Sequence, residues 1–158
     1  MKTTTALQVS LVIKMKHILF VCTGNTCRSP MAEAIFNSLT WEDGHFFATS
    51  CGIFADGVTP ISDNAKIVLN ELGITFNTVS TPISEQIMEK ADKIICMTKN
   101  HASTLLSMFP QYGAKIFVMP KDITDPFGGD INVYRKCRDE ISNCIEVILN
   151  ELTSEYNA

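Results

Sequence analysis

Cys22, Arg28 and Ser29 are the residues whose types and spacing point most directly to chemistry. They belong to the stretch Cys22-Thr-Gly-Asn-Thr-Cys-Arg-Ser29, which follows the apolar run 17–21 and precedes a helix-like segment. A thiolate is a strong nucleophile, and the planar guanidinium of arginine suits bidentate contact with two oxygens of a phosphoryl group. The stretch therefore predicts a phosphate-holding loop with a nucleophile inside it, and indicates phosphoryl transfer through cysteine.

The residues inside this stretch fit an anion-binding loop. Gly24 lets the backbone approach an anion closely, and Asn25 tolerates a left-handed conformation and can brace the loop with side-chain hydrogen bonds. The positive end of the helix that begins near Ser29, and the inward amides of residues 23–28, stabilise a negative sulfur. With six cysteines in the chain, the bare Cys-x5-Arg spacing is a weak signal. The strand before the loop and the Ser-Pro helix start after it strengthen the prediction.

Strand-like runs alternate with helix-like patterns along the chain, which favours a parallel sheet with helices on both faces. We expect strands at 17–22, 46–50, 93–97 and 115–119. We expect helices from Ser29-Pro30, from Thr59-Pro60 to Gly73, over about 84–91, from a Thr98 cap to a stop before Pro110, and over about 132–152. The sequence therefore predicts a single α/β domain built on a four-stranded parallel sheet.

Length, charge and cysteine content restrict the class of function. A chain of 158 residues that is 46% hydrophobic can bury one core. Its net charge of −4, without a Lys/Arg cluster, argues against nucleic acid or an anionic membrane as partner, and no stretch is long enough to span a bilayer. The cysteines indicate a reducing compartment rather than a disulfide framework, so we expect a cytoplasmic protein. The three histidines lack metal-ligand spacing, and we expect no metal and no cofactor.

Residues 1–14 precede the first expected strand. Segment 6–13 resembles a short signal-peptide core, but Gln8 and Ser10 interrupt it and no small-residue cleavage site precedes the strand. Because Met15 would itself make a sensible beginning for a domain that starts with a strand, an upstream start codon is one origin for this segment. We expect residues 1–14 to be an N-terminal extension and residues 15–158 to form the functional domain.

At these motifs the chain resembles the low-molecular-weight protein tyrosine phosphatase family, whose signature is a Cys-x5-Arg-Ser-Pro loop near the N-terminus. The resemblance runs from about residue 16 to the C-terminal helix, and Asp125-Pro-Phe-Gly-Gly129 matches the family's Asp-Pro loop. It implies a flavodoxin-like fold of the low-molecular-weight phosphatase type and hydrolysis of phosphorylated protein side chains through a phosphocysteine. It also implies that Cys22 is the nucleophile, Arg28 binds the phosphoryl group, Asp125 is general acid and base, Ser29 and Asn25 support the thiolate and loop, and Thr23, Gly24, Thr26 and Cys27 complete the substrate-binding loop.

The role of Asp125 also has a physical basis. An alkoxide, phenoxide or guanidine leaves phosphorus poorly unless it is protonated, so a carboxylic acid facing the thiolate has a clear task. Repulsion from the phosphoryl and thiolate charges can help Asp125 keep its proton, and Pro126 holds it in an extended conformation. Asp122 and Asp130 are nearby alternatives.

Thr26 bears on the leaving group. Members of the family that act on phosphotyrosine commonly have an aliphatic residue here, whereas this loop with Asp125-Pro-Phe-Gly-Gly129 resembles the bacterial branch that contains protein-arginine phosphatases. A threonine makes the pocket floor smaller and more polar, which disfavours an aromatic ring. Phe54 and Phe127 align with aromatic wall positions of the family, but a flat face stacks on either leaving group. We expect a phosphoarginine protein substrate, with phosphotyrosine as the alternative.

Other interpretations stay open at this point. A thioredoxin-coupled arsenate reductase uses a similar loop, but Cys96 has no companion cysteine in 98–110 for its relay. A phosphocysteine carrier would not need Arg28 or Asp125, and a phosphate-binding module would have lost the nucleophile or the acid. Cys27 is either a small apolar filler or a redox partner that traps oxidised Cys22 as a disulfide. We expect a monomer.

Overall fold

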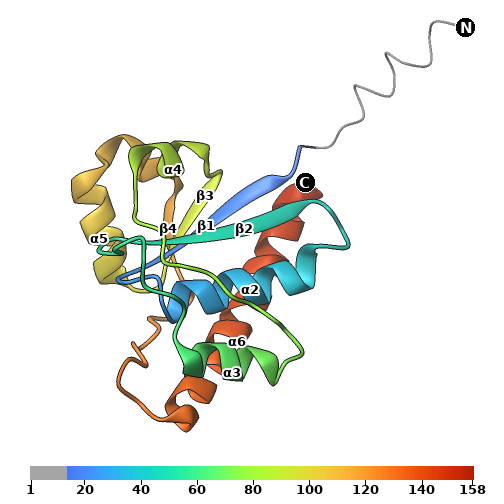
Figure 1. Ribbon diagram of the computed structural model, residues 1–158. Helices are drawn as coiled ribbons and strands as arrows, with labels where there is room; N and C mark the ends of the chain where they lie inside the picture. The colour runs from blue at the N-terminus through green and yellow to red at the C-terminus, as the bar shows by residue number, and fades with distance from the viewer. Residues whose placement is uncertain (1–13) are drawn as a thin grey trace, which may run out of the picture.

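A computed structural model describes residues 14–158 and contains a parallel sheet between two layers of helices (Figure 1). The predicted N-terminal extension lies, apart from Lys14, outside the described residues. The strands lie in the order β2-β1-β3-β4, with bounds β1 (Lys16–Cys22), β2 (Phe46–Gly52), β3 (Lys93–Cys96) and β4 (Ile116–Val118). The helices are α2 (Arg28–Thr40), α3 (Asp63–Asn70), α4 (Glu85–Lys90), α5 (Lys99–Met108), the short 3-10 helix η1 (Pro110–Lys115) and α6 (Ile131–Tyr156). The expected α/β fold with a four-stranded parallel sheet is confirmed.

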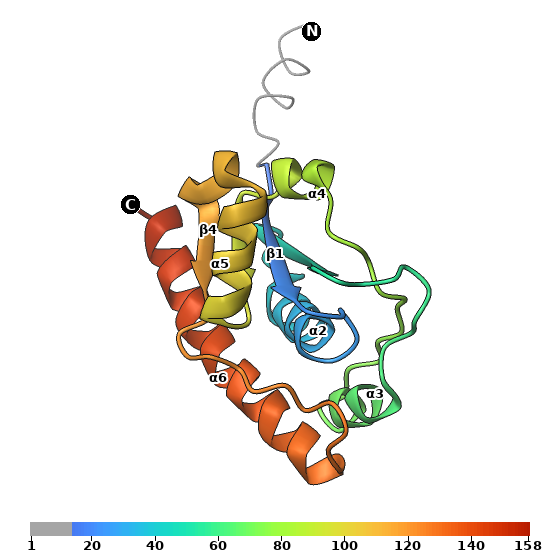
Figure 2. The same cartoon turned by 90° about the vertical axis from the view of Figure 1, so that its left-hand side faces the viewer.

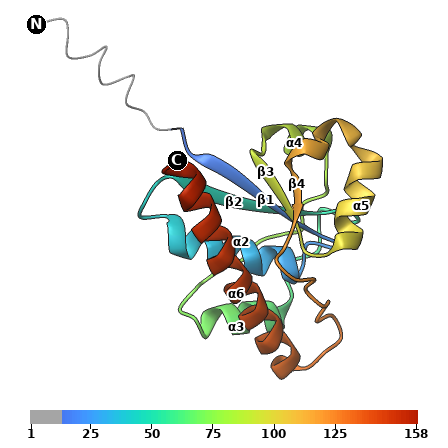
Figure 3. The same ribbon diagram turned by 180° about the vertical axis from the view of Figure 1, so that it is seen from behind.

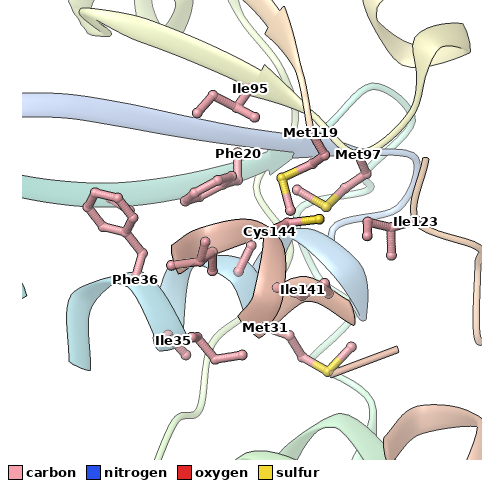
Figure 4. Close-up of a cluster of buried hydrophobic side chains, with 14 of the residues drawn as sticks. Phe20, Met31, Ile35, Phe36, Ile95, Met97, Met119, Ile123, Ile141 and Cys144 are labelled. Carbon is pink, nitrogen blue, oxygen red and sulfur yellow. The ribbon is translucent and has the colours of Figure 1, made fainter. Parts of the chain in front are cut away.

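β1 divides the core into two halves. Its side chains alternate, so that Ile18 and Phe20 join a cluster with residues of α2, α3 and α6, while Leu19 and Val21 join a cluster with residues of α4 and α5. Figure 4 shows part of the first cluster, in which Phe36 of α2 and Ile141 of α6 lie beneath the sheet. Burial on both faces explains why the run 18–22 is apolar throughout rather than alternating.

α6 is the longest helix and crosses the face of the molecule that carries α2 and α3 (Figure 3). One stripe of this helix is apolar and packs against the core, because Cys137, Ile141, Cys144, Ile145, Ile148 and Leu152 are all buried. The helix continues four residues beyond the expected end at 152. Tyr156 packs its ring 4.5 Å from the His45 ring, and Lys93 of β3 binds Glu155 at 2.8 Å. These tertiary contacts stabilise a last turn that the sequence pattern did not mark.

The predicted start of α3 at Thr59-Pro60 is wrong. The helix begins at Asp63, after Ser62, whose hydroxyl accepts the Ala65 backbone N–H at 3.2 Å. Thr59 instead donates its backbone N–H to Asp56 at 2.8 Å, and its hydroxyl bonds the same carboxylate. Pro60 forms an isolated antiparallel bridge with Val79. Thr59 and Pro60 resemble a helix start in the sequence, but they belong to a loop because Thr59 binds the Asp56 carboxylate instead of capping a helix.

The other expected elements are confirmed with small shifts at their ends. Thr98 caps α5 as expected, since its hydroxyl accepts the His101 backbone N–H at 3.2 Å. Within residues 14–158, none of the helices has the length and apolar character needed to cross a membrane.

α2 also covers the open edge of β2. The Asn37 side chain donates to the Ala48 carbonyl at 3.0 Å and accepts the Ala48 backbone N–H at 2.8 Å, as a neighbouring strand would. Glu33 lies one turn earlier on the same helix, beside the backbone of Ser50. Burial raises the pKa of Glu33 to about 7, while the Ser50 backbone N–H acts in the opposite direction. The edge is therefore closed to further strands by polar side chains, one of which titrates near neutrality.

Glu33→Gln is expected to stabilise the protein at pH 8 and to change little at pH 4. The folded state holds the Glu33 proton more tightly than the unfolded chain, so wild-type stability is lost as pH rises from about 4.5 to 7. The gain at pH 8 is on the order of 2–3 kcal/mol, measured by urea unfolding at both pH values. Glu146→Gln on the exposed face of α6 removes the same charge and should show no such pH dependence. Equal stability changes at both pH values for Glu33→Gln would contradict the assignment.

Candidate active site

The loop 23–27 connects the carboxyl end of β1 to the first turn of α2 (Figure 2). β2 and β3 pair with β1 on its two sides. The chain therefore continues from β1 to one side of the sheet and from β2 back to the other side, so the order of the strands reverses next to β1. In open α/β sheets such a switch point leaves a crevice at the carboxyl ends of the strands, where ligands bind. The sheet topology thus places the cysteine loop where a ligand site is expected.

The Cys22 thiol is buried beneath this loop and surrounded by donors. Its Sγ lies 2.9 Å from the Ser29 hydroxyl, and the Asn25 backbone N–H donates to it at 3.3 Å. Burial raises the pKa of the Cys22 thiol, while hydrogen bonds from Ser29, the charge of Arg28 and the Asn25 N–H pull it down. The donors are those that a thiolate requires, and they are already in place in the folded protein.

Asn25 fixes the shape of the loop. It is the one non-glycine residue among residues 14–158 with a left-handed backbone, at φ 56°. Its buried side chain donates to the hydroxyls of Ser29 at 2.7 Å and Ser50 at 2.9 Å, and accepts the Thr81 backbone N–H at 2.8 Å. The expectation of a left-handed asparagine that braces the loop is confirmed.

Gly52, at the end of β2, allows the loop to approach the sheet. A Cβ at this position would lie 2.6 Å from the Thr23 carbonyl oxygen and 2.8 Å from the Asn25 backbone nitrogen. Such contacts are too short for any side chain, so only glycine permits this packing of loop on strand.

The first turn of α2 carries no side-chain cap. Cys27 occupies the N-cap position without a side-chain hydrogen bond to the helix, whereas Ser62, Ser84, Thr98 and Asp130 cap α3, α4, α5 and α6. The amide groups of the first helical turn are donors, and the helix dipole adds a partial positive charge there. The backbone N–H groups in the first turn of α2 therefore have no side-chain acceptor and can donate to a bound anion.

Arg28 is buried and held in a fixed orientation. Its Nη1 donates to the Ile123 carbonyl at 2.9 Å, and its Nη2 lies 3.5 Å from the Thr23 hydroxyl and 3.6 Å from Asp125 Oδ2. The Asp125 side chain is 53% exposed, and its Oδ1 accepts the Phe127 backbone N–H at 3.1 Å. A buried guanidinium and a half-exposed carboxylate therefore meet beside the thiol.

A cavity of about 220 Å³ opens between these groups. Of the residues expected at the site, it is lined by Cys22, Thr23, Gly24, Thr26, Cys27, Arg28, Asp125 and Phe127. Asn25 and Ser29 lie behind the loop, where they contact the thiol from the side of the protein core. The Phe54 side chain is 76% exposed and is not part of the lining, although its backbone N–H donates to the Thr23 carbonyl at 2.8 Å.

The two alternative aspartates have structural tasks. Asp122 accepts the Lys99 backbone N–H at 3.1 Å, at the start of α5. Asp130 caps α6 by accepting the backbone N–H groups of Asn132 and Val133. Neither lines the cavity, so Asp125 is the one of the three aspartates that reaches it.

Sequence reasoning missed two residues that contact the loop. His101 Nε2 lies 2.8 Å from the Thr23 hydroxyl, across 78 positions of sequence. The Tyr134 hydroxyl lies 3.3 Å from Cys27 Sγ, across 107 positions, and burial together with this contact raises the pKa of Tyr134 to about 12. No local motif marks either residue, because both act through tertiary contacts. A disulfide between Cys22 and Cys27 stays a prediction.

Taken together, the cavity offers a sulfur nucleophile at its base, backbone and guanidinium donors around it, and a carboxylate at its rim. A tetrahedral phosphoryl group fits this set, since its oxygens need several donors and its departing atom needs a proton. The arrangement can therefore carry out phosphoryl transfer to sulfur.

Known proteins share this fold and much of this sequence. The protein-arginine-phosphatase of Bacillus subtilis (strain 168) is 38% identical over 146 residues, which cover 87% of this chain and 97% of the relative. The low molecular weight protein-tyrosine-phosphatase PtpB of Staphylococcus haemolyticus is 35% identical over 131 residues, covering 79% of this chain and 91% of the relative.

One solved structure with this fold holds a phosphoryl group in its active site. The YwlE arginine phosphatase, as a Cys-to-Ser mutant with a phosphorylated active-site serine, matches with a TM-score of 0.81 and 38% identity. The match covers 87% of this chain and 95% of that structure. The family model for low molecular weight phosphotyrosine protein phosphatases matches residues 17–158. This chain therefore belongs to the low molecular weight phosphotyrosine protein phosphatase family.

Proposed function

We propose that this protein hydrolyses phosphorylated side chains of proteins through a phosphocysteine at Cys22, and that phosphoarginine is its preferred substrate. The observation that carries the proposal is the single cavity that joins the Cys22 thiol, the buried Arg28 guanidinium and the Asp125 carboxylate. The phosphorylated serine in the structure of the arginine phosphatase mutant supports attack by the residue at this position of the loop.

The reaction has two displacements. In the first, Cys22 Sγ attacks phosphorus in line, the bond from phosphorus to the leaving nitrogen or oxygen breaks, and Asp125 gives that atom its proton. Arg28 and the uncapped amides of α2 stabilise the charge on the phosphoryl oxygens. In the second, water attacks phosphorus, Asp125 takes a proton from the water, and the bond from sulfur to phosphorus breaks. Ser29 donates to the sulfur as it leaves.

The preference for phosphoarginine rests on Thr26. Thr26 lines the cavity and is partly buried. Its hydroxyl leaves the floor smaller and more polar than an aliphatic side chain would, which favours a guanidinium over an aromatic ring. Asp125 can both protonate a phosphoramidate nitrogen and pair with the guanidinium product. Phe127, 80% exposed at the rim, can stack on either group and does not discriminate. Phosphotyrosine is the alternative substrate, favoured by the likeness to PtpB.

Residues 15–158 form the proposed catalytic domain. Its substrate is a phosphorylated protein rather than a nucleic acid, because the chain has a net charge of −4. We assign it to the cytoplasm as a monomer. Support for a reducing compartment comes from the six cysteines, which are all free and buried.

Cys22→Ser is expected to abolish turnover of p-nitrophenyl phosphate. The serine hydroxyl is a far weaker nucleophile and leaving group than the thiolate, so a variant phosphorylated once remains blocked. Mass spectrometry of the variant after incubation with substrate should detect one phosphoryl group. Cys144→Ser on α6 removes a buried thiol outside the cavity and should keep turnover. Retained turnover in Cys22→Ser would refute the mechanism.

Asp125→Ala is expected to slow hydrolysis according to the leaving group. Loss of a general acid costs about 10²–10⁴-fold in rate, and the loss should be smaller for p-nitrophenyl phosphate, whose leaving group needs little protonation. Steady-state kinetics with that compound and with phosphoarginine and phosphotyrosine peptides measures the difference. Asp122→Ala, which removes the carboxylate that accepts the Lys99 backbone N–H, should leave the ratio between substrates unchanged. An equal loss on all substrates would rule out Asp125 as the acid.

Thr26→Ile tests the substrate preference. The wild type should hydrolyse phosphoarginine peptides with a higher kcat/KM than phosphotyrosine peptides of the same sequence. The substitution should shift the ratio roughly 10-fold towards phosphotyrosine, the scale of one added apolar contact in a pocket. Thr104→Ile, at a partly buried position of α5 outside the cavity, serves as the control. If phosphotyrosine peptides are the better substrates of the wild type and Thr26→Ile changes nothing, the preference is wrong.

A further inference from the structure

His101 lies in the first turn of α5, buried to all but 8% of its surface, and both nitrogens of its ring have partners. Nδ1 lies 2.9 Å from the Thr98 hydroxyl, and Nε2 lies 2.8 Å from the Thr23 hydroxyl in the cysteine loop. A buried histidine thus connects a helix cap to a residue of the phosphoryl-binding cavity.

The cap favours one of the two neutral tautomers of the His101 ring. The Thr98 hydroxyl oxygen accepts the His101 backbone N–H at 3.2 Å, so its own hydrogen is free to donate to Nδ1. A neutral imidazole with Nδ1 as acceptor carries its proton on Nε2. In this tautomer Nε2–H donates to the Thr23 hydroxyl oxygen.

The surroundings keep this ring neutral. Burial lowers the pKa of His101 to about 4, and the nearby charge of Arg28 acts in the same direction. The carboxylates of Asp125 and Asp122 act in the opposite direction and do not overcome these effects. At neutral pH the imidazole is therefore a fixed donor and acceptor rather than a charge.

Thr23 is left with one free hydrogen. With the ring protonated on Nε2, the Thr23 hydroxyl oxygen accepts from His101, and Arg28 Nη2 lies 3.5 Å away as a second, weaker donor. With its lone pairs so occupied, the hydroxyl hydrogen is available to an acceptor in the cavity that Thr23 lines together with Cys22 and Arg28. An oxygen of a bound phosphoryl group is such an acceptor.

We propose that His101 is a positioning residue for the phosphoryl site: it donates to the Thr23 hydroxyl, and so directs the hydrogen of that hydroxyl to an oxygen of the substrate's phosphoryl group. The inference rests on the proposed phosphatase function and adds a residue outside the loop and the Asp-Pro segment. It assigns Thr23 a side-chain contact with the substrate, in addition to its backbone position in the loop.

The test is a double-mutant cycle read by inorganic phosphate binding and by kinetics. Thr23→Val keeps the shape of the side chain and removes the hydroxyl, and His101→Leu removes the donor. Each should weaken phosphate binding, measured by calorimetry, roughly 10-fold, the scale of one hydrogen bond to a charged group. In the Thr23→Val background, His101→Leu should cause no further loss. His101→Gln, whose amide can donate from a similar position, should recover most of the binding.

Two controls separate positioning from structure. His17 and Thr49 form a similar pair, with Nε2 2.7 Å from the hydroxyl, at the opposite end of β1, and His17→Leu with Thr49→Val should leave phosphate binding unchanged. Nitrogen NMR of the His101 ring in the wild type should show a neutral ring protonated on Nε2. A ring protonated on Nδ1, or losses that add in the double mutant, would overturn the proposal.

The readouts distinguish this inference from the function on which it rests. Phosphate binding and the ring tautomer do not require turnover, so they test His101 even if Cys22 forms no phosphocysteine. If His101→Leu does not fold, Thr23→Ser and Thr23→Val decide the matter. Serine should keep phosphate affinity within about twofold of the wild type and valine should lose it, and equal affinities would refute the role of the hydroxyl.

Discussion

The hydrogen bonds of the Asn25 side chain are the interaction on which the rest of the site depends. They tie the cysteine loop to three other parts of the chain, at Ser29, Ser50 and Thr81. A non-glycine residue at φ 56° costs about 1 kcal/mol or more, and three buried hydrogen bonds offset that cost. Because the loop takes its shape from the sheet beside it, the thiol, the amides and Arg28 can converge on one cavity without further rearrangement.

The positive groups that can hold an anion are concentrated at the cavity, although the chain as a whole is negative. The chain as a whole is negative, at −4, yet the cavity must accept a phosphoryl dianion. It does so with Arg28, a residue that is 6% exposed, and with a helix terminus without a cap. In such a poorly hydrated place these few positive and partially positive groups interact strongly with an anion. The Asp125 carboxylate lies at the half-exposed rim, where solvent can reach it.

The sequence predicted those features that depend on local patterns. Strands buried on both faces appear as apolar runs, and Thr98 and the stripe of α6 follow ordinary capping and periodicity. The start of α3 was mispredicted because Thr59 has two competing partners, the helix backbone and Asp56, and only the fold decides between them. The motif located the loop and Asp125, but it could not tell that Asn25 and Ser29 lie behind the loop or that Phe54 lies outside the lining. His101 and Tyr134 reach the loop from distant positions that no local pattern links to it.

The bond from Arg28 to the Ile123 carbonyl spans 95 residues, and it bears on when the site comes into being during synthesis. A chain that has left the ribosome only through β3 carries the complete cysteine motif but lacks the carbonyl that orients Arg28, the Asp125 carboxylate and the Tyr134 hydroxyl beside Cys27. Domains of this size fold as units, so these groups arrive together with α6. Until then Cys22 lacks the partners that these distant residues bring to the loop. Phosphoryl transfer is thus a property of the finished domain, and a truncated or half-made chain has no means of acting on a passing phosphoprotein.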